Sequence, residues 1–187
     1  SFMDELAAES AKDPITFRRT YLKDERSSEL LDKLEEVSGW KNRTKGYGVA
    51  ITECFGSTVG QIVKVSKNAE NKIQIDQVWA VIDCGWYVNP DIIKAQVEGS
   101  IVMALGAATI HEITFKDGKT VQNNFNTYKM PRITDIPPIE VYIMENDADA
   151  GGVGEPGLPP FAPALTNAIF DLTGKRIRKL PFELAKV

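Results

Sequence analysis

The chain has 187 residues and a formal net charge of −4, from 22 basic and 26 acidic side chains. Hydrophobic residues make up 43% of it, which is enough for an ordinary core and too many for wholesale disorder. This length suits one domain or one piece of a larger protein. The dispersed basic residues argue against nucleic acid as a partner, and the one basic cluster, at 175–179, is interpreted as a solvated face.

Cysteine and histidine are too scarce to suggest a metal centre built by this chain alone. Cys54 and Cys84 are thirty positions apart, no Cys-x-x-Cys pair occurs, and His111 is the only histidine. These counts argue against a zinc site or an iron–sulfur cluster held by these residues. We expect two buried free thiols and a structural histidine.

No segment predicts a membrane span or a signal peptide. The longest apolar stretch, 101–110, is much shorter than the roughly 20 residues that a span needs. The opening residues are acidic and amphipathic, and they do not look like a natural start, so we expect a longer polypeptide or a split subunit. The sequence leaves the compartment open between cytoplasmic and periplasmic.

Residues 1–45 predict a helical segment. Phe2 and Leu6 share one helical face, and Asp13-Pro14 has the form of an N-cap followed by proline at the first helical position. A further apolar stripe ends at Gly39, a helix-stop signal. Its members are Leu30, Leu31, Leu34 and Val37.

Residues 46–187 predict strands and helices in separate blocks. Strands are expected at 47–55, 59–65, 73–82 and 139–144, where β-branched residues are frequent. A hairpin with strands at 110–115 and 120–125 is expected around Asp117-Gly118. Helices are expected after Asn89-Pro90 and at 163–173, and the whole pattern predicts an α+β fold with a mixed or antiparallel sheet. The first of these helices buries Ile93, Val97, Ile101, Ala104 and Leu105 and presents Gln96, Gly99 and Met103 on its other face.

The best indication of function is the run from Gly151 to Gly157, which holds one acid, Glu155, among four glycines and a proline. Glycine lets a bulky ligand approach the backbone, and Pro156 favours an extended conformation at Glu155. An apolar, proline-rich stretch follows, and apolar surroundings favour the neutral form of a carboxylate, as a base near neutral pH requires. Glu155 is therefore a candidate general base, although an exposed turn acid fits this composition equally well.

Gln96 is a second candidate, because an amide beside Gly99 can offer both a donor and an acceptor to a planar heterocycle. An ordinary surface amide is the alternative. Trp79, Trp86 and Tyr87 could stack on a ligand, but core packing is the safer expectation for them.

Five segments together resemble the C-terminal part of the molybdenum-binding subunit in the xanthine oxidase family of molybdenum hydroxylases, in particular the isoquinoline 1-oxidoreductase β-subunit type. The similarity extends over nearly the whole chain. The segments are Val81–Gly85, Val88–Pro90, Gln96–Gly99, Asn126–Pro131 and Gly152–Pro156.

The resemblance implies a specific activity and site. Glu155 would be the base of a hydroxylation that takes its oxygen from water, Gln96 would hydrogen-bond the pterin, and Gly152, Val153 and Gly154 would lie against its metal end. The cofactor would be a molybdenum-pterin, in the cytosine dinucleotide form. Partners would be the remainder of the molybdenum subunit, an iron–sulfur subunit and a small-molecule substrate, either an N-heterocycle or an aldehyde.

The chain is several times shorter than family subunits and lacks their upstream cofactor loops. We therefore expect it to bind little or no molybdenum alone. Two other interpretations stay open: a non-catalytic scaffold or assembly domain that keeps the family fold, and a free-standing ligand-binding domain.

Overall fold

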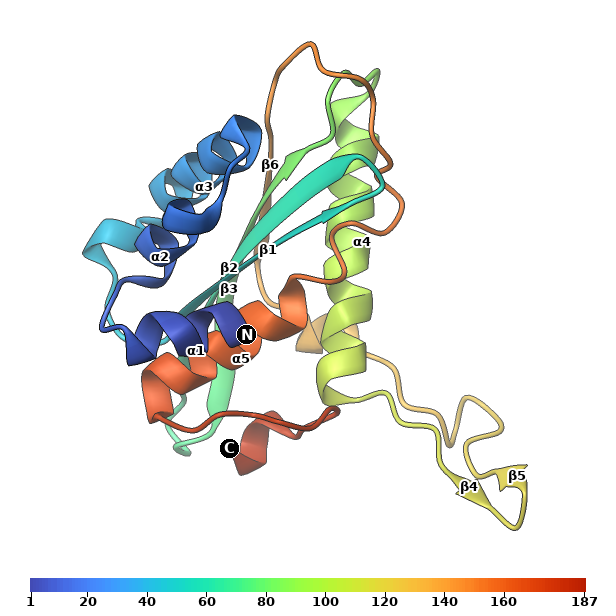
Figure 1. The fold of residues 1–187 in the computed structure, drawn as a ribbon. Coiled ribbons are helices and arrows are strands. Elements are labelled where there is room, and N and C mark those ends of the chain that lie inside the picture. The colour runs from blue at the N-terminus through green and yellow to red at the C-terminus, as the bar shows by residue number, and fades with distance from the viewer.

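The computed structural model describes residues 1–187 and arranges them around one four-stranded sheet with helices on both faces (Figure 1). Strands β1 (Tyr47–Cys54), β2 (Ser57–Lys67) and β3 (Ile73–Asp83) form an antiparallel meander. Strand β6 (Ile139–Ile143) adds to β3 in parallel, in the order β1-β2-β3-β6. The α+β prediction, with a mixed sheet, is confirmed.

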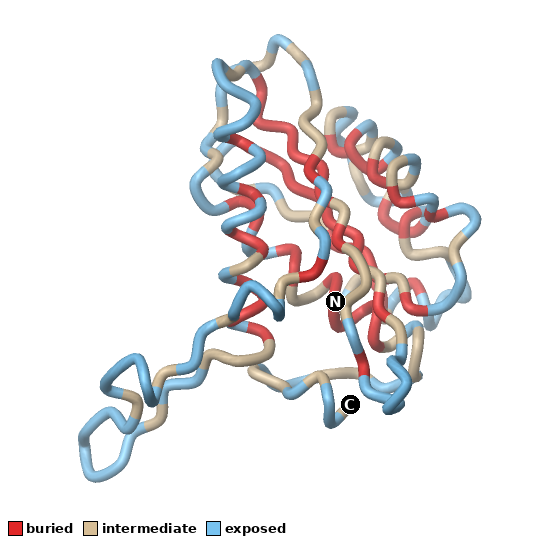
Figure 2. The backbone as a smooth tube through the Cα atoms, turned by 180° about the vertical axis from the view of Figure 1, so that it is seen from behind, coloured by how far each residue is buried: buried red, intermediate tan, exposed pale blue.

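Two hydrophobic clusters hold the layers together. The larger lies between the sheet and helices α4 and α5, and the smaller lies between the opposite face and α3. Figure 2 shows the buried strands running between these layers. The helices are α1 (Phe2–Glu9), α2 (Pro14–Tyr21), α3 (Glu25–Ser38), α4 (Pro90–Thr109) and α5 (Phe161–Thr173), with short 3₁₀ turns at Trp40–Asn42, Ile133–Asp135 and Leu184–Lys186.

The predicted start and stop signals of the helices are confirmed. The Asp13 carboxylate accepts hydrogen bonds from the N–H groups of Ile15 and Thr16, at 3.0 and 2.9 Å. Asn89 caps α4 in the same way, and Gly39 ends α3 in the left-handed conformation. Local capping chemistry therefore fixes these boundaries.

The apolar face predicted for α1 forms but is not covered within this chain. Phe2 and Leu6 are exposed, whereas Asp4 and Ala7 are buried. The reason is a long-range ion pair: Arg18 of α2 reaches Asp4 and turns that side of α1 inward.

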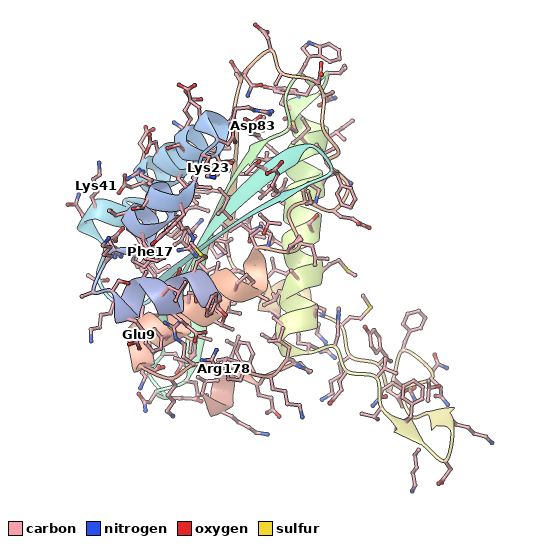
Figure 3. The ribbon with its side chains drawn as sticks, viewed as in Figure 1. Glu9, Phe17, Lys23, Lys41, Asp83 and Arg178 are labelled. Carbon is pink, nitrogen blue, oxygen red and sulfur yellow. The ribbon has the colours of Figure 1, made fainter.

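The basic cluster at 175–179 also differs from a purely solvated face. The Arg176 guanidinium lies 3.4 Å above the ring centroid of Phe170, and Arg178 forms a two-point ion pair with Glu5. Figure 3 shows Arg178 beside α1, so these arginines tie the end of α5 to the start of the chain.

Residues 111–135 form an arm that leaves the body at the end of α4 and returns to it at the 3₁₀ turn Ile133–Asp135 (Figures 1 and 2). The Asp117-Gly118 turn is confirmed, with φ of 51° and 72°, but strands β4 (Phe115–Lys116) and β5 (Lys119–Thr120) are much shorter than predicted. No second layer covers them, so little stabilises a longer ladder. The large apolar side chains exposed on the arm are Ile113, Phe115, Val121, Phe125, Met130 and Ile133.

Helix α4 is the only helix that is long and apolar enough to cross a membrane by length and composition, with a mean hydropathy of 1.2. Its five-residue predicted stripe is buried against the sheet and α5, as a core helix requires.

Candidate functional site

The glycine-rich run begins after β6 and passes beside α4 on its way to α5 (Figure 1). The turn between β1 and β2 and the residue that follows β3 hold its first part. The N–H groups of Gly151 and Gly152 donate to the carbonyls of Cys84 and Phe55, both at 2.8 Å, and the Ser57 hydroxyl donates to the Gly152 carbonyl at 2.7 Å. We call these contacts the first anchor of the run.

A second anchor lies beyond Glu155. The Gly157 carbonyl accepts a hydrogen bond of 2.6 Å from the Gln61 side-chain amide of β2. Gly157 also packs directly on α4, since a Cβ there would lie 3.1 Å from the Ser100 Cβ and 3.3 Å from the Val97 Cα. Glycine is needed at this close approach.

Glu155 lies in the segment between the two anchors. Its side chain is exposed, and its carboxylate forms neither a hydrogen bond nor an ion pair with the rest of the chain. The space beside Gly154 is also open, because a Cβ there would meet no atom within 4 Å. The apolar enclosure expected around Glu155 is therefore not supplied by these residues alone.

The Cys54 thiol is close enough to Glu155 to be affected by its charge. Burial of its thiol and the negative charge of Glu155 both raise the pKa of Cys54. Cys54 is half-buried at the end of β1, whereas Cys84 is fully buried, and both are free thiols. The β1–β2 turn therefore places a thiol within the electrostatic reach of Glu155.

Gln96 is exposed on α4, with Gly99 and Met103, as the sequence predicts. Nothing lies within 4 Å of a Cβ placed on Gly99. The next residue, Val97, contacts Gly157, so the helical turn that carries Gln96 touches the loop that carries Glu155. Two candidates about sixty positions apart are thus brought to one region of the surface. Val153 is half-buried and packs against the larger core cluster, while Gly152 and Gly154 keep their backbone exposed.

Asp83 fixes the path of the chain before the first anchor. Its carboxylate accepts hydrogen bonds from Arg26 of α3, from Asn146 after β6 and from the Gly85 N–H. Burial disfavours the charged form of Asp83, but these donors, Arg26 foremost, outweigh it and hold the pKa of Asp83 below its ordinary value. Figure 3 shows Asp83 at the end of the sheet beside α3.

The aromatic candidates occupy different environments. Trp79 stacks on Tyr47, with ring centroids 5.9 Å apart, and Tyr87 packs against the larger core. Trp86 is 61% exposed, so the core-packing expectation is wrong for it. His111 lies outside any strand, with its ring packed against Gly106 and 5.3 Å from that of Tyr128.

Gln61, Phe55 and Asn146 contribute to this region but were not among the residues singled out from the sequence. Gln61 had a recognisable signal. It is a polar residue between Val59 and Val63 on one face of a strand that is buried on both faces. The positions of Phe55 and Asn146 depend on contacts between distant segments and have no local signature.

A family model described as the molybdopterin cofactor-binding domain matches residues 33–137, more than half of the chain. The chain belongs to this family. The molybdopterin-binding match includes β1 to β3, α4 and Gln96, and the anchored loop lies beyond it.

Relatives of this chain from the molybdopterin cofactor-binding family are oxidoreductase subunits. It is 33% identical over 193 residues to isoquinoline 1-oxidoreductase subunit beta of Brevundimonas diminuta, covering 99% of the chain and 25% of the relative. It is 33% identical over 152 residues to the aldehyde oxidoreductase molybdenum-binding subunit PaoC of Escherichia coli (strain K12), covering 75% of the chain and 21% of the relative.

The aldehyde oxidoreductase of Desulfovibrio gigas has a similar fold. Its structure matches with a TM-score of 0.59 at 26% identity, over 70% of this chain and 15% of that one. The chain thus spans about a quarter or less of the proteins that it resembles.

Proposed function

We propose that this chain supplies the catalytic base and part of the cofactor cradle of a molybdenum-dependent hydroxylase or dehydrogenase that oxidises an N-heterocycle or an aldehyde with oxygen from water. The observation that carries the proposal is the free carboxylate of Glu155, held between two anchors beside the exposed face of α4. The relatives named for isoquinoline and aldehyde oxidation support this substrate class.

The exposed residues fit a planar cofactor. Gly99 and Gly154 leave open space where other residues would carry side chains. The Gln96 amide is exposed and can both donate to and accept from a heterocycle edge. Gln96 and the backbone of Gly152, Val153 and Gly154 would hold a molybdenum-pterin here, in the cytosine dinucleotide form. When bound, that cofactor supplies the redox chemistry.

Glu155 would act as the proton acceptor. A carboxylate with no competing partner in its own chain can accept a proton from a hydroxyl placed within about 2.6–3.2 Å. Exclusion of water would strengthen the electrostatic interactions of the Glu155 carboxylate. The polypeptide that encloses the carboxylate and excludes water would come from outside this chain.

The remainder of the molybdenum subunit and an iron–sulfur subunit are the proposed partners. The arm at 111–135 supports the first of these, because six large apolar side chains are exposed along the arm and at its base, where soluble domains seldom leave so many uncovered. The same arm favours a second role for this chain, as an assembly scaffold.

Glu155→Gln in the assembled enzyme tests the catalytic proposal. We expect kcat to fall roughly 10²–10⁴-fold, the usual contribution of a positioned base, while molybdenum content and substrate KM stay within twofold. Glu29→Gln is the matched control, since Glu29 is an exposed acid on α3, across the sheet from the site. Unchanged turnover in Glu155→Gln would leave the scaffold role as the better account.

A further inference from the structure

Gln61 is a primary amide in the middle of a hydrophobic core. It is fully buried in β2, and its neighbours across the ladders are Ala50 and Ala80. Val59 and Val63, two positions to either side, belong to the larger core cluster. An apolar side chain would suit this position better, because burying an amide is unfavourable unless its polar atoms are hydrogen-bonded.

The hydrogen bonds of Gln61 only partly offset that cost. Its side-chain N–H group donates to the Gly157 carbonyl at 2.6 Å, whereas its oxygen, Oε1, is buried without a partner. The side-chain hydrogen bond that Gln61 gains is directed to one place, the loop that follows Glu155.

This hydrogen bond limits the freedom of Glu155. The N–H of Leu158 donates to the Glu155 carbonyl at 2.9 Å, which closes a turn around Gly157. Gly157 is held from one side by Gln61 and packs from the other on Val97 of α4. With the first anchor at Gly152, residues 153–156 are the only part of the run left between fixed points.

We propose that Gln61 is a positioning residue, which fixes the Gly157 carbonyl and thereby the place of the Glu155 carboxylate. The inference rests on the proposed function of Glu155. Small displacements of a catalytic group are costly: a shift of about 1 Å can reduce rates roughly 10²-fold. Since Gln61 is buried, it acts through the loop and touches neither substrate nor cofactor.

Stability and turnover separate this role from a structural one in the assembled enzyme. Gln61→Leu and Gln61→Met each remove the unsatisfied oxygen but also leave the Gly157 carbonyl without its donor. These two effects oppose each other, so we expect the Tm to change by only a few degrees. We expect kcat to fall roughly 10- to 100-fold with substrate KM within twofold. Amide hydrogen exchange across 152–158 should become faster in both variants.

Val63→Ala is the matched control, because Val63 is fully buried on the same face of β2 and has no contact with the loop by hydrogen bond. We expect its Tm to fall by several degrees, with kcat and loop exchange unchanged. Gln61 variants that lose Tm while kcat and exchange at 152–158 stay at wild-type values would overturn the positioning role.

Glu155→Gln, measured in parallel, keeps the two proposals apart. If it is inactive and both Gln61 variants turn over normally, only the positioning role fails. If it retains full turnover, the proposed function itself fails, whatever the Gln61 variants do.

Discussion

Arg26 of α3 and Asp83 at the end of β3 form a two-point ion pair, with Nε to Oδ2 at 2.9 Å and Nη2 to Oδ1 at 2.6 Å. Asp83 also accepts from Asn146, so the pair connects α3 to the segment that leads into the glycine-rich run. The layer opposite α4 therefore contributes to the shape of the candidate site without contacting it.

Arg26→Ala should destabilise the chain, because Asp83 would remain buried without its main donor. Arg26 is more than a third exposed, so solvent screening limits the expected loss to about 1–2 kcal/mol. Urea unfolding at pH 7 measures it. Lys72→Ala, which removes a surface ion pair with Glu70, is the control and should change stability by less than about 0.5 kcal/mol. Equal effects of the two variants would contradict the special role of Asp83.

The same pair predicts a pH dependence. The pKa of Asp83 is held below its ordinary value, which is about 3.9 in an unfolded chain. Its contribution to stability is therefore complete above about pH 4 and is lost as the pH falls through the folded-state pKa. Arg26→Ala should raise that pKa and move acid unfolding to higher pH, as followed by circular dichroism. An unshifted acid transition would count against this assignment.

Cys54 offers a test of the site geometry in the chain alone. The charge of Glu155 is one of the two causes that raise the Cys54 pKa, after burial. Glu155→Gln should lower this pKa, so that alkylation of Cys54 at a fixed pH near 8 becomes faster. Glu29→Gln should leave the rate unchanged. Cys84 is fully buried and should react only on unfolding, so the signal belongs to Cys54. Identical rates in both variants would place Glu155 away from Cys54.

Two glycine substitutions should separate folding from cofactor retention. Gly154→Ala meets open space and needs no left-handed backbone, so the isolated chain should keep its Tm or gain slightly. In the assembled enzyme the new methyl group should lower molybdenum content. Gly152→Ala should lower the Tm itself, since its Cβ would lie 2.9 Å from the Phe55 Cβ. Normal molybdenum content in Gly154→Ala would argue against a cofactor at this surface.

The arm should matter for assembly more than for folding. Phe125 and Ile133 are each 87% exposed, so replacing both with Ser should change the stability of the isolated chain by less than about 1 kcal/mol. Co-purification with the remainder of the molybdenum subunit should fall at least tenfold. Tyr21→Ser, an exposed aromatic on α2, is the control. Undiminished co-purification of the double variant would exclude the arm as a docking surface.

Much of the fold could be predicted from the sequence because its signals are local. The four strands of the main sheet, the Asp13 and Asn89 caps and the stop at Gly39 depend on neighbouring residues, and the structure confirms them. Which side of α1 is buried within this chain could not be predicted, because the ion pair with Arg18 decides it.

In the candidate site, too, the residues with local signals could be predicted and those that depend on long-range contacts could not. Glu155 and Gln96 could be named from local composition and family resemblance. The support around Glu155 could not, since it depends on which β2 residue lies opposite the loop after β6. Only the full sheet register places Gln61 beneath Gly157.

The two anchors also allow exchange at the exposed part of the run. Gly154 and Glu155 are exposed between fixed carbonyls of the scaffold, whereas Val153 packs against the core and Pro156 is buried. Exchanging only Gly154 and Glu155 for the corresponding residues of another family member would then compare different side chains on an identical support, without redesigning the core.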